Sequence, residues 1–481
     1  MAPAGPRPAS RRPAEAGVAL LIVLVVLFIV AVLMTDISLT ATTARRSAHN
    51  ASTEFLMNAA VDRKFHVGVA QIRYENPVHE GYSTLDDRWA LKEYTNEEKE
   101  SPGDGASGAA DAGAGEEGVK VYGEGGKGQV TATLRRLWDP APDLDLGIGE
   151  ATPIEDEDRK FNLYLLLHPD PEVRGTARER FSVLLDQFRQ DTPLDVTPTV
   201  ADELREQVVG YLERDAPAGG QAGIPVRRKD PWWILTPDEL CNAPGLEDKV
   251  HGLSAKGILF DSQDPREYRD YQADPEGRDE PPAYPGLLRY VTVWSGDAFK
   301  KEFTKDSKFP VNLNTADRTV LRALFHREGP NFEFVEKLLK WRLDEKEGAG
   351  TGAPASSGED AQPTVHNRLE KVADLEKAAE GSYEAIRKKN FETEGGRSLL
   401  EFLTGVRSST FSLFIRAERE VEAAADDEED GRSKESESVR LFRFVVRRKG
   451  LDPKTRLYGY QTILREERDD PWFPPAEATE R

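Results

Sequence analysis

The residues that could carry out chemistry are sparse and scattered in this chain. Its seven histidines are spread over 481 residues, and its single cysteine, Cys241, has no histidine close to it in sequence. No glycine-rich phosphate loop follows a predicted strand, and no Gly-x-Ser-x-Gly, His-Glu-x-x-His or Cys-x-x-Cys motif occurs. Nucleophilic and metal-assisted catalysis need such groups held together, so the sequence predicts no catalytic residue and no enzyme.

Oxygen ligands suited to a hard cation are plentiful. They include the carboxylates of Glu213, Asp215 and Asp230 and those in the stretch 261–264. No Asp-x-Asp-x-Asp-Gly loop is present, however, and acidic residues are normally solvated. We therefore expect any single one of these side chains to face water, and no metal ligand is assigned from the residues.

The N-terminal region carries the strongest signal. Seventeen apolar residues, 18–34, follow Gly17 without a charge. As a helix they would be about 25 Å long, close to the hydrocarbon thickness of a bilayer. The basic residues Arg7, Arg11 and Arg12 precede the run, and positive charge stays on the cytoplasmic side. The pattern predicts a single pass through a bacterial inner membrane, with the large C-terminal body in the periplasm.

Three fates of this segment are compatible with its composition. It could be a signal peptide cleaved near residues 41–44, an uncleaved anchor, or a helix released by a cut between Gly17 and Val18. The third is favoured because the segment continues as a helix to about residue 76. No proline occurs in residues 14–76, and small or apolar residues recur mostly at steps of three or four: Ala44, Ala48, Ala51, Phe55, Ala59, Phe65, Val69 and Ile72.

A basic leader that ends in glycine, followed by an apolar helix with an amphipathic second half, resembles the type IV pilin-like proteins, and among them the pseudopilins of type II secretion. The resemblance implies that a prepilin peptidase cleaves after Gly17 and that the new N-terminus, Val18, is methylated. It also implies partners: the other minor pseudopilins, the major pseudopilin, the peptidase and the inner-membrane assembly platform.

One residue departs from the usual pattern of that family. Most pilin-like proteins have glutamate at the fifth mature position, where this chain has Ile22. The glutamate of one subunit neutralises the N-terminal amine of its neighbour, since an unpaired charge in an apolar bundle costs several kcal/mol. A subunit without it suits the end of a filament. In this respect the chain resembles the general secretion pathway protein K (GspK) family.

Further segments support that resemblance. Residues 208–215, 232–246 and 310–316 are similar to elements of the protein K family. Thr236 and Glu239 suggest a capping box, and Asn314 or Thr315 could cap the helix that follows by accepting backbone N–H bonds. Strands are predicted at residues 129–137, 161–167, 288–294, 410–418, 439–446 and 458–464. Helices are predicted at residues 171–190, 200–214, 369–388 and 398–403.

The expected fold class is α+β. The resemblance implies a pilin-like fold, a long N-terminal helix plus a small antiparallel sheet, with a large inserted α-helical domain. The expected organisation is a leader at 1–17, a helix at 18–76, an α+β domain from 119–170 and 405–470, an inserted mainly helical domain at 171–404, and flexible low-complexity loops at 101–127, 346–363 and 423–438.

The formal net charge of −21 argues against binding nucleic acid. The expected function is that of a minor pseudopilin at the tip of the type II secretion pseudopilus, which starts or caps assembly for the export of folded proteins. Two alternatives stay open: a minor pilin of a type IV pilus, and a membrane-anchored helix-hairpin-helix DNA binder, because residues 242–246 and 312–316 resemble parts of that motif. No cofactor is assigned, but the resemblance makes calcium a candidate ligand of the helical domain.

Overall fold

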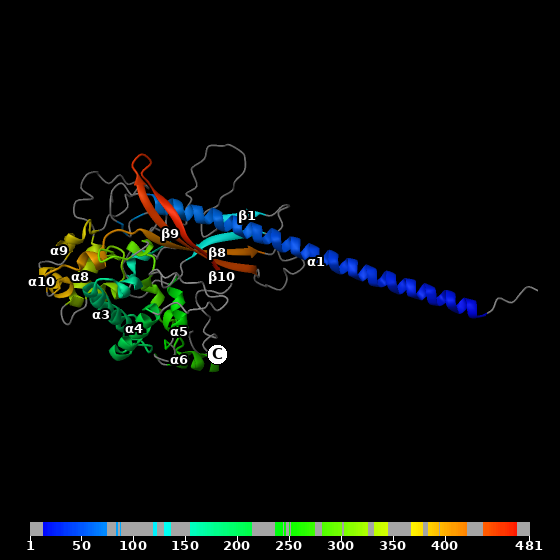
Figure 1. Ribbon diagram of the computed structural model, residues 1–481, viewed down its shortest axis with the longest axis horizontal. Coiled ribbons are helices and arrows are strands. Elements are labelled where there is room, and N and C mark those ends of the chain that lie inside the picture. Colours follow the sequence, from blue (N-terminus) through cyan, green and yellow to red (C-terminus); the bar gives the residue numbers. More distant parts are fainter. Residues whose placement is uncertain are drawn as a thin grey trace, which may run out of the picture.

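Figure 1 shows the computed structural model of the protein. It describes residues 13–74, 83–84, 87, 119–122, 129–135, 154–213, 236–243, 245–246, 250, 252–274, 281–300, 303–325, 331–344, 367–378, 383–393, 395–420 and 436–468.

One long helix, α1, runs from Pro13 to Arg73 and is 61 residues long. Its second half lies against the sheet, and its first half projects alone from the body (Figure 1). The absence of proline after Pro13 lets the hydrogen-bonded ladder continue from the apolar run into the amphipathic part.

The main sheet is antiparallel and combines strands from both ends of the chain. Its strand order is β1-β2-β8-β9-β10, and β3 also pairs with β8. The register of β8 with β9 runs from Thr410 opposite Arg447 to Glu420 opposite Ser436. The strands are β1 (Val119–Tyr122), β2 (Gln129–Arg135), β3 (Ile154–Asp156), β8 (Thr410–Glu420), β9 (Ser436–Asp452) and β10 (Leu457–Arg468).

The two faces of this sheet bury different partners. Leu413 and Phe444 belong to the core that the sheet forms with α1, whereas Phe414 and Val445 belong to the core of the helical portion. This alternation follows from the period of two along a strand. On the α1 side the rings of Phe65 and Phe444 stack with centroids 4.4 Å apart. The sheet therefore lies between α1 and the helical portion.

Gly68 sets the close approach of α1 to the sheet. A Cβ at this position would lie 2.3 Å from Cδ2 of Leu413, nearer than real Cβ contacts allow. The sequence thus places its smallest residue where the helix crosses β8.

The helical portion comprises short helices around one large core. Asp170 begins α3 by accepting hydrogen bonds from the backbone N–H groups of Glu172 and Val173. The helices are α3 (Pro171–Gln187), α4 (Pro198–Glu213), α5 (Ala255–Leu259), α6 (Pro265–Ala273), α7 (Arg318–Phe325), α8 (Asn331–Leu343), α9 (Leu375–Ala378), α10 (Tyr383–Phe391) and α11 (Leu400–Leu403).

Short strands and 3-10 helices connect these elements. Two parallel pairs are present, β4 (Phe161–Asn162) with β5 (Val291–Thr292), and β6 (Val311–Asn312) with β7 (Thr404–Gly405). The 3-10 helices are η2 (Glu157–Arg159), η3 (Leu163–Leu167), η4 (Pro237–Asn242), η5 (Leu287–Arg289), η6 (Gly296–Phe299) and η7 (Val372–Asp374).

Several predicted elements are wrong in detail. The strand expected at residues 161–167 ends after Asn162, because the Asn162 side chain accepts a hydrogen bond from the backbone N–H of Tyr164 and turns the chain into η3. The strand expected at residues 288–294 is reduced to β5, since its first residues form η5. The helix expected at residues 369–388 is divided into η7, α9 and the start of α10.

The expected low-complexity loops fall mostly outside the described residues, as all of 346–363 does. Within the other two, residues 119–122 form β1 and residues 436–438 begin β9. The α+β fold class, with a long N-terminal helix, an antiparallel sheet and a helical portion, is confirmed by the structure.

Candidate functional site

The first half of α1 exposes its apolar side chains. Every large apolar side chain that the structure describes between residues 21 and 39 is exposed, from 43% at Val30 to 69% at Phe28 and Met34. We call residues 21–39 the exposed apolar half of α1. Leaving a Val, Leu or Phe side chain in water instead of burying it costs about 1.5–3 kcal/mol. This surface therefore requires lipid or protein around it.

By length and composition, α1 could cross a membrane. Its best window within Val23–Arg73 has a mean hydropathy of 2.6 and no residue buried in the protein. The predicted processing residues Gly17, Val18 and Ile22 also lie within α1. Cleavage after Gly17 and methylation of Val18 stay predictions.

The carboxylates considered for calcium serve other contacts where the structure describes them. Glu213 pairs with Arg178, and Asp261 binds Arg289 and the backbone N–H of Gly286. Asp264 begins α6 and pairs with Arg266 at 2.7 Å. Asp215 and Asp230 lie outside the described residues. Among the described residues no group of three or more His, Cys, Asp or Glu side chains could hold a metal.

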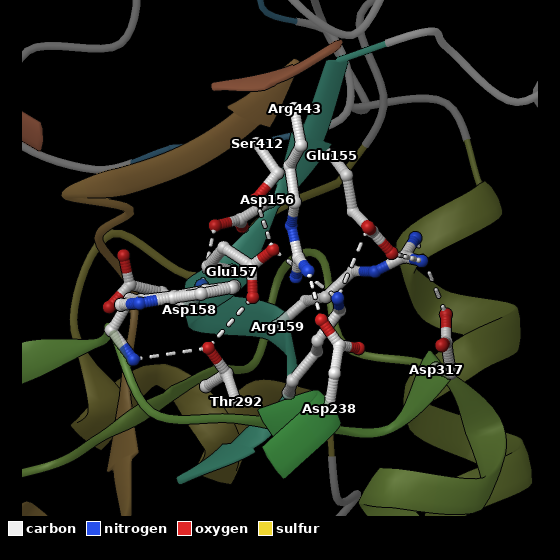
Figure 2. A network of polar contacts seen from close by, with 12 residues as sticks. Glu155, Asp156, Glu157, Asp158, Arg159, Asp238, Thr292, Asp317, Ser412 and Arg443 are labelled. Carbon is white, nitrogen blue, oxygen red and sulfur yellow. Dashed lines mark hydrogen bonds and ion pairs between the residues drawn. The ribbon is translucent and has the colours of Figure 1, made fainter. Parts of the chain in front are cut away.

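A second group of polar side chains lies inside the protein, at residues 155–160, which run from the end of β3 through η2 to the residue before β4. We call it the buried charged segment. All of its residues except Arg159 are buried, and Glu157 is 0% exposed. Figure 2 shows that its side chains point toward the sheet on one side and toward the helical portion on the other.

Asp156 ties this segment to two distant loops. Its Oδ2 atom accepts hydrogen bonds from Oγ1 of Thr315, at 2.6 Å, and from Oγ of Ser408. Its Oδ1 atom accepts from the backbone N–H of Asp158 at 2.9 Å, which starts η2. Burial raises the pKa of Asp156 to about 6, against the lowering effect of the two hydroxyl bonds.

Asp158 holds the start of β8. Its Oδ2 atom accepts hydrogen bonds from the backbone N–H groups of Ser409, at 2.6 Å, and Thr410, at 2.9 Å. Burial and the neighbouring charge of Asp156 raise the pKa of Asp158 to about 7, although these backbone N–H bonds favour its ionised form.

The other two carboxylates of the segment balance its cations. Nζ of Lys160 lies 3.1 Å from Glu155 and 3.4 Å from Glu157. Burial opposes ionisation of Glu155, but Lys160 and Arg159 together lower its pKa. Glu157 also accepts a hydrogen bond at 2.7 Å from Oγ1 of Thr292.

Arg443 makes a neighbouring connection between the sheet and the helical portion. Its guanidinium donates to Asp238 at 2.8 Å, and both side chains are buried. The same group lies over the ring of Trp294, 4.4 Å from its centroid. The ion pair thus joins β9 to η4, and the ring contact joins β9 to the segment that follows β5.

From the sequence we did not predict that residues 155–160 are buried or that they contact the sheet and the helical portion. A run of four carboxylates followed by two bases is ordinarily solvated, so its composition does not indicate that it is buried. The flanking apolar residues Ile154 and Phe161 and the hydroxyl cluster at 408–410 are the features that could have indicated it.

The capping role predicted for Asn314 or Thr315 is wrong. Oδ1 of Asn314 accepts from the backbone N–H of Leu369 at 2.9 Å, and the Thr315 hydroxyl donates to Asp156. Tertiary partners therefore take the atoms that a local cap would use. By contrast, Glu239 accepts the backbone N–H of Thr236 at 3.2 Å, as the capping box requires.

The turn that resembled a DNA-binding motif is also engaged internally. The backbone N–H groups of Leu313, Asn314, Thr315 and Ala316 bond to Gly405 or Asn312. A phosphate would need these groups free, so this segment offers no such binding site.

No protein-family model and no curated protein matches this chain. Among solved structures, it is similar to one chain of the GspK–GspI–GspJ complex from the enterotoxigenic Escherichia coli type 2 secretion system. The likeness has 15% sequence identity and a TM-score of 0.37, and it covers 89% of this chain and 99% of that chain. The overlap is thus nearly complete in length and low in structural agreement.

Proposed function

We propose that the protein is a minor pseudopilin of a type II secretion system, anchored in the inner membrane with its body in the periplasm. The observation that carries this proposal is the continuity of α1. One unbroken helix exposes its apolar half and buries Phe65, Val69 and Ile72 of its second half against the sheet. Such a helix can be held by lipid first and by neighbouring helices later without refolding the body.

Two features support a position at the tip of the pseudopilus. Ile22 cannot neutralise the amine of a subunit above it, and the helical portion adds bulk beyond the sheet. The partners would be the other minor pseudopilins and the major pseudopilin, and the chain would start or cap assembly. The role is structural, with no catalytic step and no cofactor assigned.

Processing provides the decisive experiment. Intact-mass analysis of the membrane-extracted protein should show a chain that begins at Val18 and carries one N-methyl group. A bulky replacement, Gly17→Leu, should leave the precursor uncut and abolish secretion. Ala16→Leu, one residue earlier, is the matched control and should be processed normally.

Two results would contradict the proposal. One is a mature chain that keeps residues 1–17 or begins near residues 41–44. The other is normal secretion by uncleaved Gly17→Leu protein. A type IV pilus would give the same processed mass, so the secretion assay separates the two systems.

A further inference from the structure

A stretch of bare helix separates the exposed apolar half of α1 from the body. The first buried side chain described on α1 is that of Met57, and residues 40–52 are exposed throughout. Two adjacent arginines, Arg45 and Arg46, lie on this stretch. Neither forms a hydrogen bond or ion pair with any residue that the structure describes.

The surroundings of these arginines on the helix hold no countercharge. Acidic partners one turn away would stand at residues 41–43 or 48–50, which are Ala, Thr, Thr, Ala, His and Asn. His49 in turn lies 3.0 Å from Arg419, a third cation. The pair is therefore two free positive charges at the edge of a long apolar surface.

Asp36 marks where the hydrocarbon must end. It is the first acidic residue after the apolar run, and an ionised carboxylate inside the bilayer core costs several kcal/mol. Counting back from Asp36 to residue 18 gives about 27 Å of helix, close to the thickness of the core. The outer headgroup layer should begin close to Asp36.

The arginines stand at the right height above that boundary. Arg45 lies nine positions after Asp36, which is about 13 Å along the helix axis. Helical side chains lean toward the N-terminus, here toward the membrane, and an extended arginine reaches about 6 Å. The remaining distance, about 7 Å, is the depth of one headgroup layer.

We propose that Arg45 and Arg46 bind the phosphate groups of anionic phospholipids at the periplasmic surface of the inner membrane. This rests on the proposed function, because it requires α1 to span that membrane. The guanidinium fork matches phosphate oxygens in geometry and charge. After removal of the leader with Arg7, Arg11 and Arg12, this pair would fix the height of the helix until it leaves the bilayer.

Reconstituted full-length protein tests the proposal. Leu33→Trp places a reporter in the exposed apolar half, and brominated phosphatidylglycerol or phosphatidylcholine quenches it in vesicles of the two lipids. We expect a preference for phosphatidylglycerol that falls by up to about fivefold for each arginine replaced in R45Q/R46Q. High salt should weaken the preference, because the arginines are exposed.

The control removes the same charge elsewhere. Lys449 and Lys454 are exposed on the β9–β10 hairpin, which lies near the C-terminal end of α1 (Figure 1). K449Q/K454Q should keep the lipid preference of the parent. An equal loss in the control, or an unchanged preference in R45Q/R46Q, overturns the proposal and would favour an acidic protein partner. No quenching by either lipid would instead refute the membrane span itself.

Discussion

In the exposed apolar half of α1, leucine, valine and phenylalanine side chains stand in the open, whereas the buried charged segment places carboxylates and a lysine inside the protein. Both regions reverse the usual distribution of polarity, but they do so for different reasons. The carboxylates accept hydrogen bonds from side chains of the same chain, such as Ser408 to Asp156 and Thr292 to Glu157. The apolar side chains find no partner in the part of the chain that the structure describes. Buried charges whose partners lie within the protein indicate a structural role. Exposed apolar side chains with no partner in the described structure indicate a surface that contacts a membrane or another protein.

The largest effect should come from breaking an internal ion pair. Arg443→Ala removes the buried ion pair with Asp238, and we expect a loss of about 3–5 kcal/mol in the free energy of unfolding. Denaturant titration of the full chain in detergent measures it. The control is Arg440→Ala, on the same strand as Arg443, which removes a half-exposed ion pair with Glu467. It should lower the free energy of unfolding by about 1 kcal/mol or less. Equal losses in both variants would show that the buried pair has no special role.

The exposed half should respond in the opposite way. Leu27→Arg places a charge in the middle of the apolar run and should disfavour membrane insertion by about 2.5–3.5 kcal/mol. The free energy of unfolding of the body should not change. Fractionation and alkaline extraction of membranes measure insertion. Phe55→Arg, at a position 72% exposed but outside the run, is the matched control and should insert normally.

A smaller effect should appear in the pH dependence of stability. The pKa of Asp158 lies near 7 in the folded protein, above its ordinary value of 3.8, because of burial and Asp156. The folded state therefore holds its proton more tightly, and this contribution stabilises at low pH and is lost as the pH rises through about 7. Between pH 5 and pH 8, the wild type should lose stability relative to Asp158→Asn, which does not titrate there.

The difference between the two pH profiles is the measured quantity, since the amide introduces a constant offset of its own. Glu418→Gln, at a half-buried carboxylate on β8 that pairs with Arg416, is a control. A parallel pair of profiles for wild type and Asp158→Asn would contradict the prediction.

Long and strongly patterned elements could be predicted from the sequence. The helix expected at residues 18–76 is α1 (Pro13–Arg73), and the strands expected at residues 410–418, 439–446 and 458–464 are shorter versions of β8, β9 and β10. Their periodicity is set by burial along one face, which is local information. Residues 161–167 could not be assigned in this way, because a single asparagine side chain decides where the strand ends.

The buried charged segment was beyond sequence reasoning for a physical reason. Its charges are compatible with burial only because hydroxyl and backbone N–H groups from residues 292, 315 and 408–412 converge on them. Those partners lie more than a hundred residues away in sequence. The exposed apolar half, by contrast, was recognisable because its meaning depends on no distant residue.

The pairing of β3 with β8 has a consequence for the history of the molecule. Asp156 lies directly opposite Phe411, so the chain leaves the sheet and re-enters it at adjacent points. Residues 157–410 therefore connect two paired antiparallel strands at the point where a short hairpin turn would otherwise stand. An ancestral chain could have acquired that material at a surface turn without disturbing the strands, and a laboratory deletion that rejoins the two strands by a short Asn-Gly link would reverse the event.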